Sequence, residues 1–379
     1  MKIDVKNIDV EQTQQHGLPP EVFKATEIFD KECDAVFRQG WVSLASAQQL
    51  PEVGDMLPVK IGNASLLIMR GADDTIGVFH NICRHKAAPL VDSACRKRVL
   101  VCPYHRWAYN LDGSLRAAPK YYGDSEQPMS AQDKADKGLL PVRSAVWWDT
   151  IFVNLSGDAE PFEEFIRPLD QLLEGYDSDG LRMISTTEYQ SSANWKLAVD
   201  NFLDGYHVPF VHSQAVTLDS VMNQEDLFLS DNIAGLRLPT GASDKPAKTD
   251  KPLPHFRHLT EENVGTQQWF GIFPNTLLFV DPVWVQLIIV RPEAPTAASE
   301  TLTIYAANPE SMADEFAPQR EALSAALNEV NQQDIELLDK LQFTRTAPEA
   351  SQGHLVQAWD QVNVRFHQMW LQKMQAAEG

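Results

Sequence analysis

The chain has 379 residues, of which 44% are hydrophobic, so it can bury the cores of two or three domains. Its formal net charge of −20 disfavours nucleic acid and anionic membranes as partners, because both repel an acidic surface. The chain lacks a run of about eighteen apolar residues, and its N-terminus has no apolar core of a signal peptide. These features predict a cytoplasmic protein.

The first expected elements are a helix over residues 20–39 and a domain of short strands. The helix belongs to an N-terminal segment, residues 1–40, that we expect to lie against a later domain. Residues 41–155 predict an antiparallel β domain, because short apolar runs alternate with turn residues. The strands expected in this domain are 65–69, 75–79, 99–101, 142–148 and 151–155.

Two short loops in this β domain carry a metal-binding pattern. Cys83 and His85 form a C-x-H sequence, and Cys102 and His105 form a C-x2-H sequence. Two thiolates and two imidazoles on separate loops are the ligand set of a Rieske [2Fe-2S] cluster, in which one iron takes both cysteines and the other both histidines. The pattern therefore predicts electron transfer.

A structural zinc site is the alternative interpretation of the same four residues. Zinc fingers usually place two cysteines before two histidines, whereas here the two residue types alternate, which favours the cluster. The positions at which respiratory Rieske proteins carry an extra disulfide hold Ala88 and Tyr104, so we expect a low cluster potential. The remaining Cys33 and Cys95 are expected to be inert thiols.

The segment around these loops is basic although the chain is acidic. Between His80 and Lys120, eight basic residues against two acidic ones give +6, which leaves −26 for the remainder. Two interpretations are open: an ordinary solvated surface, or a docking patch that attracts an acidic electron donor.

A second constellation follows an acidic linker that begins at residue 157. His207 and His212 lie five residues apart, and they could face one metal only if a helix ends or bends between them, a break that we assign to Pro209. Asp204 lies three residues before His207, where its carboxylate could hold the imidazole. A third, carboxylate ligand would complete the two-histidine, one-carboxylate set of ferrous oxygenases.

A long C-terminal helix, residues 318–343, supplies a candidate for this third ligand. Its apolar residues recur every three or four positions, and Asp334 interrupts the stripe. A buried carboxylate must be protonated, hydrogen-bonded or bound to a cation. The alternative is a helix that is less buried at this turn. The predicted stripe comprises Leu323, Leu327, Val330, Asp334, Leu337, Leu338 and Leu341.

The segment between the β domain and the C-terminal helix predicts a sheet and one long loop. Residues 238–256 are a lid over the metal or plain surface disorder, and His255 and His258 near it are expected to be exposed. Several aromatic residues could line a substrate pocket or fill the core. The expected strands are 183–190, 267–273, 276–280, 283–291 and 301–307. The aromatic and apolar candidates are Phe202, Trp269, Phe270, Phe273, Leu277, Phe279 and Trp284.

The two motifs in this order resemble the α subunits of the Rieske non-heme iron oxygenases. The resemblance covers roughly residues 35 to 345 and includes Asn194-Trp195-Lys196 and Asp200-Asn201. It implies an α+β fold, with an antiparallel β Rieske domain at 41–155 and a helix-grip catalytic domain, a sheet around a long helix, at 156–379. It implies cluster ligands Cys83, His85, Cys102 and His105, and mononuclear iron ligands His207, His212 and Asp334.

The resemblance also implies a homotrimer. In this family the two metal sites of one chain lie too far apart for fast transfer, so Asp204 is expected to bridge His207 to His105 of a neighbouring subunit. The interface is head-to-tail and closes as a ring. No nicotinamide or flavin motif is evident, so the electrons must come from a separate NAD(P)H-dependent reductase, with or without a ferredoxin.

The predicted function is that of a terminal oxygenase that uses O2. Our first choice of substrate is a small aromatic, carboxylated or not, as in aromatic hydrocarbon catabolism. The second is oxidative demethylation or hydroxylation of a quaternary ammonium compound held by aromatic side chains. A different class, an electron-transfer or redox-sensing iron-sulfur protein, would not need His207, His212 and Asp334.

Overall fold

The computed structural model describes residues 5, 8, 16–123, 127–212, 221–239 and 251–377. The chain forms two compact units. The small unit is Leu44–Asp158, and the large unit combines Met1–Ser43 with Ala159–Gly379. The domain limits drawn from the sequence, 1–40, 41–155 and 156–379, stay predictions.

The small unit consists of short antiparallel strands, as the sequence predicted. They form sheets of order β1-β10-β9, β4-β3-β2-β5 and β6-β7-β8. The apolar faces of these strands enclose a core that includes Leu67, Leu100 and both motif cysteines, Cys83 and Cys102. The elements are β1 (Trp41–Ser46), η4 (Ala47–Gln49), β2 (Asp55–Ile61), β3 (Ala64–Arg70), β4 (Ile76–His80), β5 (Cys95–Arg96), β6 (Leu100–Val101), β7 (Ala108–Tyr109), β8 (Leu115–Ala117), α3 (Ala131–Ala135), β9 (Arg143–Trp147) and β10 (Thr150–Asn154).

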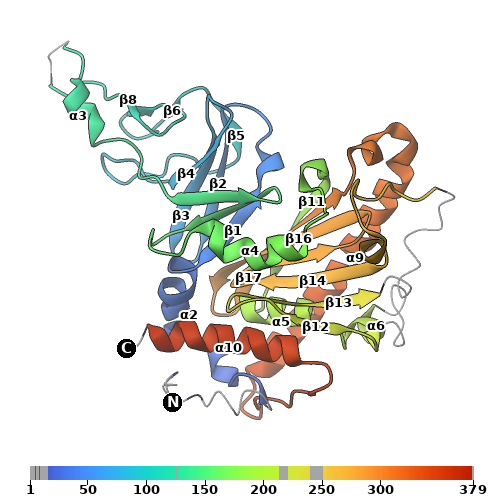
Figure 1. The fold of residues 1–379 in the computed structure, drawn as a ribbon. Helices are drawn as coiled ribbons and strands as arrows, with labels where there is room; N and C mark the ends of the chain where they lie inside the picture. The colour runs from blue at the N-terminus through green and yellow to red at the C-terminus, as the bar shows by residue number, and fades with distance from the viewer. Residues whose placement is uncertain are drawn as a thin grey trace. The chain divides into compact units, whose positions relative to one another are not determined.

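The large unit is built on a seven-stranded antiparallel sheet of order β11-β17-β16-β15-β14-β13-β12 (Figure 1). Each strand from β12 to β16 pairs antiparallel with the next one along the chain, and β11 pairs with β17 at the edge. The sequence predicted five of these strands and missed β12 and β13. Their bounds are β11 (Arg182–Ser191), β12 (Glu225–Phe228), β13 (Ile233–Pro239), β14 (Thr266–Ile272), β15 (Thr276–Val280), β16 (Trp284–Ala294) and β17 (Ala297–Ala306).

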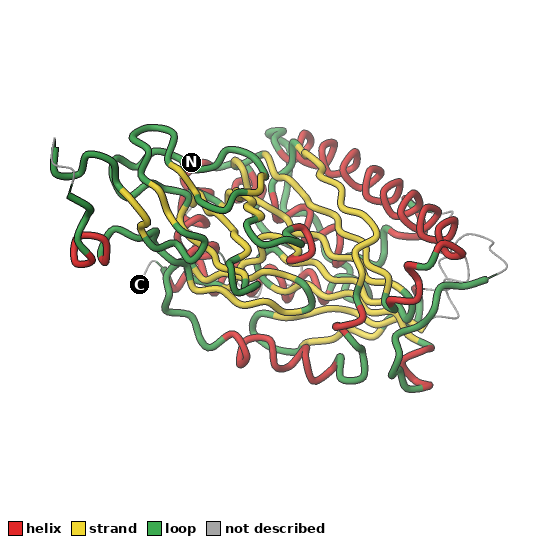
Figure 2. Tube along the Cα trace, turned by 90° about the horizontal axis from the view of Figure 1, so that it is seen from above, coloured by secondary structure: helices red, strands yellow, loops and turns green. Residues whose placement is uncertain are grey.

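Two helices lie on the sheet and position the downstream metal motif. The longest, α9 (Ala317–Arg345), runs along β11 and β17 and is seen beside the strands in Figure 2. Helix α5 (Trp195–Leu203) contacts β14, β16 and β17 as well as α9. The other helices are α4 (Phe162–Leu172), η5 (Ser178–Gly180), α6 (Val208–Val211), α8 (Glu261–Val264), η7 (Pro309–Met312), η8 (Asp314–Phe316) and α10 (Gln361–Ala376).

The N-terminal helix predicted over residues 20–39 is interrupted. It consists of η2 (Pro20–Phe23), α2 (Thr26–Glu32) and a π-helical turn, η3 (Cys33–Arg38). Helix α10, which the sequence did not predict, contacts η3 and α5. Across the described residues, every helix is too short or too polar to cross a bilayer. The predicted cytoplasmic location stays a prediction.

Helix α9 is buried along a different stripe from the one predicted. Leu323 and Leu338 are buried as expected, but Leu341 is 36% exposed, and the polar side chains of Asn331 and Gln342 are buried instead. The reason is that the sheet and the start of α5 present polar groups to this helix. Asn331 Nδ2 donates to Glu300 on β17, and Gln342 Oε1 accepts the backbone N–H of Asn194.

Candidate metal centres

The two loops of the upstream motif bring their four side chains together. Cys83 and Cys102 are almost fully buried, whereas His85 and His105 are exposed, with ring centroids 4.6 Å apart. The His85 ring also stacks on Trp107 at 5.0 Å. Two cysteines inside and two histidines at the surface fit a cluster whose inner iron takes sulfur and whose outer iron takes imidazole.

Both loops are closed by the same pair of backbone hydrogen bonds. The Cys83 N–H donates to Ala88 O, and the Ala87 N–H donates to Cys83 O. In the second loop the Cys102 N–H donates to Trp107 O, and the Arg106 N–H donates to Cys102 O. The fifth residue of each loop, Ala87 or Arg106, therefore has a left-handed backbone, with φ of 54° and 60°.

Glycine at either left-handed position is expected to stabilise the small unit. A non-glycine residue there costs ~1–2 kcal/mol, part of which the extra freedom of glycine in the unfolded chain offsets. Arg106→Gly and Ala87→Gly should each raise the free energy of unfolding by ~0.5–1 kcal/mol, measured by denaturant titration. Ala108→Gly on β7 is the control and should lower it; a loss of stability in all three variants would contradict the prediction.

Two residues that the sequence reasoning did not single out hold the first loop. Tyr109 Oη lies 3.3 Å from Cys83 Sγ and accepts the backbone N–H of Arg84 at 3.1 Å. The buried Asn81 side chain accepts the N–H groups of Leu90 and Val91 and donates to Val91 O. Local spacing in the sequence does not reveal these contacts, because Tyr109 lies on β7, outside the loop that it holds.

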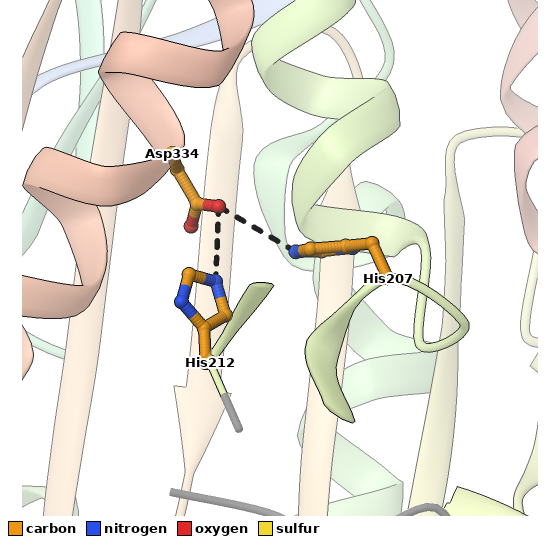
Figure 3. A group of neighbouring side chains, drawn as sticks. All are labelled: His207, His212 and Asp334. Carbon is orange, nitrogen blue, oxygen red and sulfur yellow. Dashed lines mark hydrogen bonds and ion pairs between the residues drawn. The ribbon is translucent and has the colours of Figure 1, made fainter. Parts of the chain in front are cut away.

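The downstream motif converges on one point (Figure 3). His207 Nε2 lies 3.5 Å and His212 Nε2 lies 3.0 Å from the same oxygen, Asp334 Oδ1. One ligand atom from each of the three residues lies within 4.8 Å of the others. Two imidazole nitrogens and one carboxylate that converge in this way form the two-histidine, one-carboxylate donor set of ferrous oxygenases.

The helix break between the two histidines differs from the prediction. Helix α5 ends at Leu203, and the chain turns through Asp204 before α6 begins at Val208. Pro209 is not the breaker; it lies in the first turn of α6, where a missing N–H costs nothing. Asp204 faces His207 across this turn and not along one helix face. The predicted contact is present, at 3.5 Å from Oδ2 to Nδ1.

Groups from outside the triad hold both imidazoles, through a hydrogen bond to His212 and an ion-pair contact to His207. Gln333, next to Asp334 on α9, places Oε1 2.8 Å from His212 Nδ1. Asp204 in turn accepts the backbone N–H of Tyr206 at 2.7 Å, which fixes its carboxylate beside His207. Partners of this kind set the tautomer and the orientation of a metal-binding histidine. The role of Gln333 emerges only from the fold.

The charges at the site favour an ionised carboxylate and a protonated imidazole. Burial alone would lower the pKa of His207, but Asp204 and Asp334 outweigh it and raise that pKa to about 9. Burial would likewise raise the pKa of Asp334, but His207 and His212 lower it to about 2. The buried carboxylate predicted from the helix stripe is therefore ionised and paired.

Metal affinity at this site is expected to rise with pH. His207 must lose its proton to bind a metal, and its pKa of about 9 means that protons compete below that pH. The affinity of metal-free protein for Mn(II), measured by anaerobic chelator competition, should increase about tenfold per pH unit from 7 to 8.5 and level off above 9. Asp204→Asn should shift the plateau to lower pH. A flat profile between pH 7 and 9 would contradict this assignment.

The remaining residues singled out from the sequence lie away from these two groups. Cys33 is buried, Cys95 is half-buried, and neither forms a disulfide. His255 and His258 are exposed, as predicted. The middle of the proposed lid, residues 240–250, lies outside the described residues. Of the described residues, the three of Figure 3 are the one group of this size suited to a metal ion.

Comparisons with known proteins agree with this arrangement. Residues 40–123 match the model of the Rieske [2Fe-2S] domain, and residues 178–376 match the ring hydroxylating alpha subunit (catalytic domain). The chloroplastic choline monooxygenase of Spinacia oleracea is 26% identical over 94% of this chain and 78% of its own length. The glycine betaine monooxygenase oxygenase subunit of Chromohalobacter salexigens is 31% identical over 56% of this chain and 46% of its own length.

Solved structures with the same fold cover almost the whole chain. A quaternary ammonium Rieske monooxygenase superposes with a TM-score of 0.79 at 20% identity, over 99% of both chains. The naphthalene 1,2-dioxygenase from Rhodococcus sp. has a TM-score of 0.76 at 21% identity, over 98% of this chain and 97% of that one. The fold is therefore that of Rieske oxygenase α subunits, α+β with antiparallel sheets, as predicted. The chain belongs to the Rieske non-heme iron oxygenases and is an oxidoreductase, a terminal oxygenase component with a [2Fe-2S] cluster and a mononuclear iron.

Proposed function

We propose that this protein oxidises a quaternary ammonium compound with O2. The observation that carries the proposal is the similarity to choline monooxygenase over 94% of the chain, combined with a three-residue iron site in the part that matches the catalytic family model. The names of the relatives favour the second substrate class drawn from the sequence. Our first choice, hydroxylation of a small aromatic in aromatic hydrocarbon catabolism, has no support beyond the shared fold with naphthalene dioxygenase.

The residues of the two centres have separate roles. Cys83, His85, Cys102 and His105 would hold the cluster, and His207, His212 and Asp334 would hold ferrous iron. When bound, the two groups supply electrons and oxygen activation. Gln333 and Asp204 hold the imidazoles so that both Nε2 atoms face Asp334. A protein that used its cluster alone would gain nothing from this second convergent site, which argues against the electron-transfer alternative.

A substrate panel tests the proposal. Purified protein with a surrogate reductase should couple oxygen uptake to choline, glycine betaine or carnitine, and not to benzoate or naphthalene. Formaldehyde release with one of these substrates would identify demethylation, and its absence would identify hydroxylation of the carbon chain. Coupled turnover of an aromatic acid without turnover of any quaternary ammonium compound would overturn the proposal.

We also propose that the electrons come from a separate NAD(P)H-dependent reductase, with or without a ferredoxin. The loops around the cluster motif support this, because basic side chains such as Arg84, Lys86 and Arg106 are exposed there beside His85 and His105. An acidic donor would be attracted to them. Reduction of the cluster should therefore slow markedly between low and physiological ionic strength, as measured by stopped-flow absorbance with an acidic ferredoxin.

We further propose a homotrimer in which Asp204 of one subunit meets His105 of the next. Both side chains are accessible, His105 at the tip of its loop and Asp204 with 29% of its side chain exposed. The similar quaternary ammonium Rieske monooxygenase has been described in terms of inter-subunit electron transfer. The relay proposed for His105, Asp204 and His207 would then join sites on different chains.

Mixed trimers test this arrangement. Cys102→Ser should remove the cluster and Asp334→Ala the iron site, so neither variant alone should be active. Co-expressed chains should recover activity, because a neighbour can supply the missing site in mixed trimers. Light scattering should give the mass of three chains. Inactive mixed assemblies would show that the sites acting together lie on one chain.

A further inference from the structure

Three aromatic rings share the face of the large sheet that is turned toward α5. Trp269 on β14 pairs with Phe279 on β15, and Phe279 pairs with Gln286 on β16, so their side chains lie on one face. Trp284, two residues before Gln286, lies on that face as well. Gly271, two residues after Trp269, lies so close to α5 that a Cβ there would be 3.0 Å from Leu203 Cδ1. The face therefore looks toward the helix that leads into the His207 turn.

The three rings form a corner. The Trp269 and Phe279 centroids are 4.4 Å apart with their planes at 71°, and the Phe279 and Trp284 centroids are 4.4 Å apart at 27°. Phe279 and Trp284 are buried, but Trp269 keeps part of its surface accessible. The three rings pack directly on one another, so Trp269 is the ring whose accessible surface can attract a quaternary ammonium group, and Phe279 and Trp284 support it.

A buried carboxylate lies at the same end of this face. Asp281, in the turn between β15 and β16, accepts Gln267 Nε2 at 2.7 Å and the Val283 N–H at 2.9 Å. Both donors are neutral, and within the described ranges no ion pair joins Asp281 to a basic side chain. Burial raises the pKa of Asp281 by more than its two hydrogen bonds and the nearby His255 lower it. A bound cation would stabilise the ionised carboxylate.

This corner is connected to the iron site by aromatic contacts. Trp269 and Trp359 pack on the same small cluster, which contains Leu236. The Trp359 ring stacks on Tyr206 with centroids 4.9 Å apart. Tyr206 directly precedes the metal-site residue His207. Trp269 is therefore linked to the metal-site turn through Trp359 and Tyr206.

Elsewhere in the chain, aromatic rings and a carboxylate already surround one ammonium group, that of Lys196. Lys196 Nζ lies 5.2 to 5.4 Å from the ring centroids of Phe23, Trp195 and Trp370, and 2.5 Å from the Glu32 carboxylate. That cage is filled by its own lysine. In contrast, no described lysine or arginine lies over the three rings of the corner.

We propose that Trp269, Phe279 and Trp284, with the Asp281 carboxylate beside them, form the subsite for the cationic head of the substrate. This inference rests on the proposed function and names the residues that select the substrate class. Trp269, supported by the other two rings, provides the face for the methyl groups, and the carboxylate compensates their positive charge. An aromatic or neutral substrate would leave the buried carboxylate without a compensating charge. We therefore expect this subsite to discriminate between a charged group and a neutral group of the same shape.

Choline and its neutral carbon isostere, 3,3-dimethylbutan-1-ol, provide the test, because they differ in charge and hardly in shape. Binding to the intact protein, with both metals bound and no reductant, is measured by titration calorimetry. Trp269→Leu should weaken choline binding about tenfold and leave binding of the isostere within about twofold. Trp269→Phe should keep most of the choline affinity of the unaltered protein. Asp281→Asn should also weaken choline binding selectively.

Two control variants report general damage. Trp147→Leu in the small unit removes a tryptophan elsewhere, and Asp226→Asn removes another half-buried carboxylate of the same sheet; both should leave the two affinities unchanged. If Trp269→Leu fails to fold, Trp269→Phe and Asp281→Asn carry the test. An equal loss for both ligands, or no change, would overturn the subsite and leave the proposed function standing. Failure of the unaltered protein to bind or oxidise any quaternary ammonium compound would overturn both.

Discussion

Replacing Asp334 by alanine is expected to remove the mononuclear iron and to lower substrate-coupled oxygen uptake at least ~100-fold. The carboxylate is the point that both imidazoles share, through Oδ1 at 3.5 Å and 3.0 Å. Without it, His207 and His212 retain two neutral ligands and lose the negative charge that offsets the metal. Metal analysis should fall from about three irons and two sulfides per chain to about two of each.

The control for this variant lies on the same helix. Glu336 is an exposed carboxylate two residues further along α9, and Glu336→Ala should keep all three irons and full activity. The visible absorption of the cluster should be unchanged in both variants, because Asp334 belongs to the other unit. An Asp334→Ala protein that retains the third iron and coupled oxygen uptake would contradict the ligand assignment.

Replacing Lys196 by methionine is expected to cost ~3–5 kcal/mol of unfolding free energy. Lys196 and Glu32 are both fully buried and are joined at 2.5 Å. Glu32 also accepts the indole N–H groups of Trp195 and Trp370, so one carboxylate links α2, α5 and α10. Burial lowers the pKa of Lys196 despite the neighbouring Glu32, which shows how strongly this site disfavours a lone charge. Methionine would leave that lone charge on Glu32.

Denaturant titration of the unaltered protein, the two single variants and the double variant checks this explanation. The double variant Lys196→Met with Glu32→Gln should lose less stability than the sum of the two single variants, because the residues form one pair. Glu27→Gln, an exposed position on α2, is the control and should change stability by less than ~0.5 kcal/mol. Additive losses would show that each residue acts separately.

The expected strands were recovered where apolar runs are bounded by turn residues. The prediction for residues 276–280 coincides with β15. The strands predicted at 142–148 and 151–155 differ from β9 and β10 by one residue at each end. β12 was missed because it is short, and both β12 and β13 include polar side chains such as Glu225 and Arg237. Their pairing depends on β14, a partner that lies outside any local window.

The stripe of α9 shows why helix faces are harder to predict. Periodicity assigns leucines to the buried face, but Asn331 and Gln342 are buried because the sheet and the N-terminal segment offer them hydrogen-bond partners. The position of Asp334 could still be predicted, since a carboxylate in an apolar repeat requires a partner. Which partner it finds cannot be inferred from the helix alone.

By itself, the sequence determined the class of the protein and the residue types at both metal sites, because cysteine, histidine and aspartate at these spacings have few other uses. The tertiary structure alone decided how those residues are held. Tyr109 reaches Cys83 from a facing strand, and Gln333 reaches His212 from another helix, because hydrogen bonds depend on distances that folding creates. The aromatic corner of Trp269 likewise exists only because three strands place alternate residues on one face.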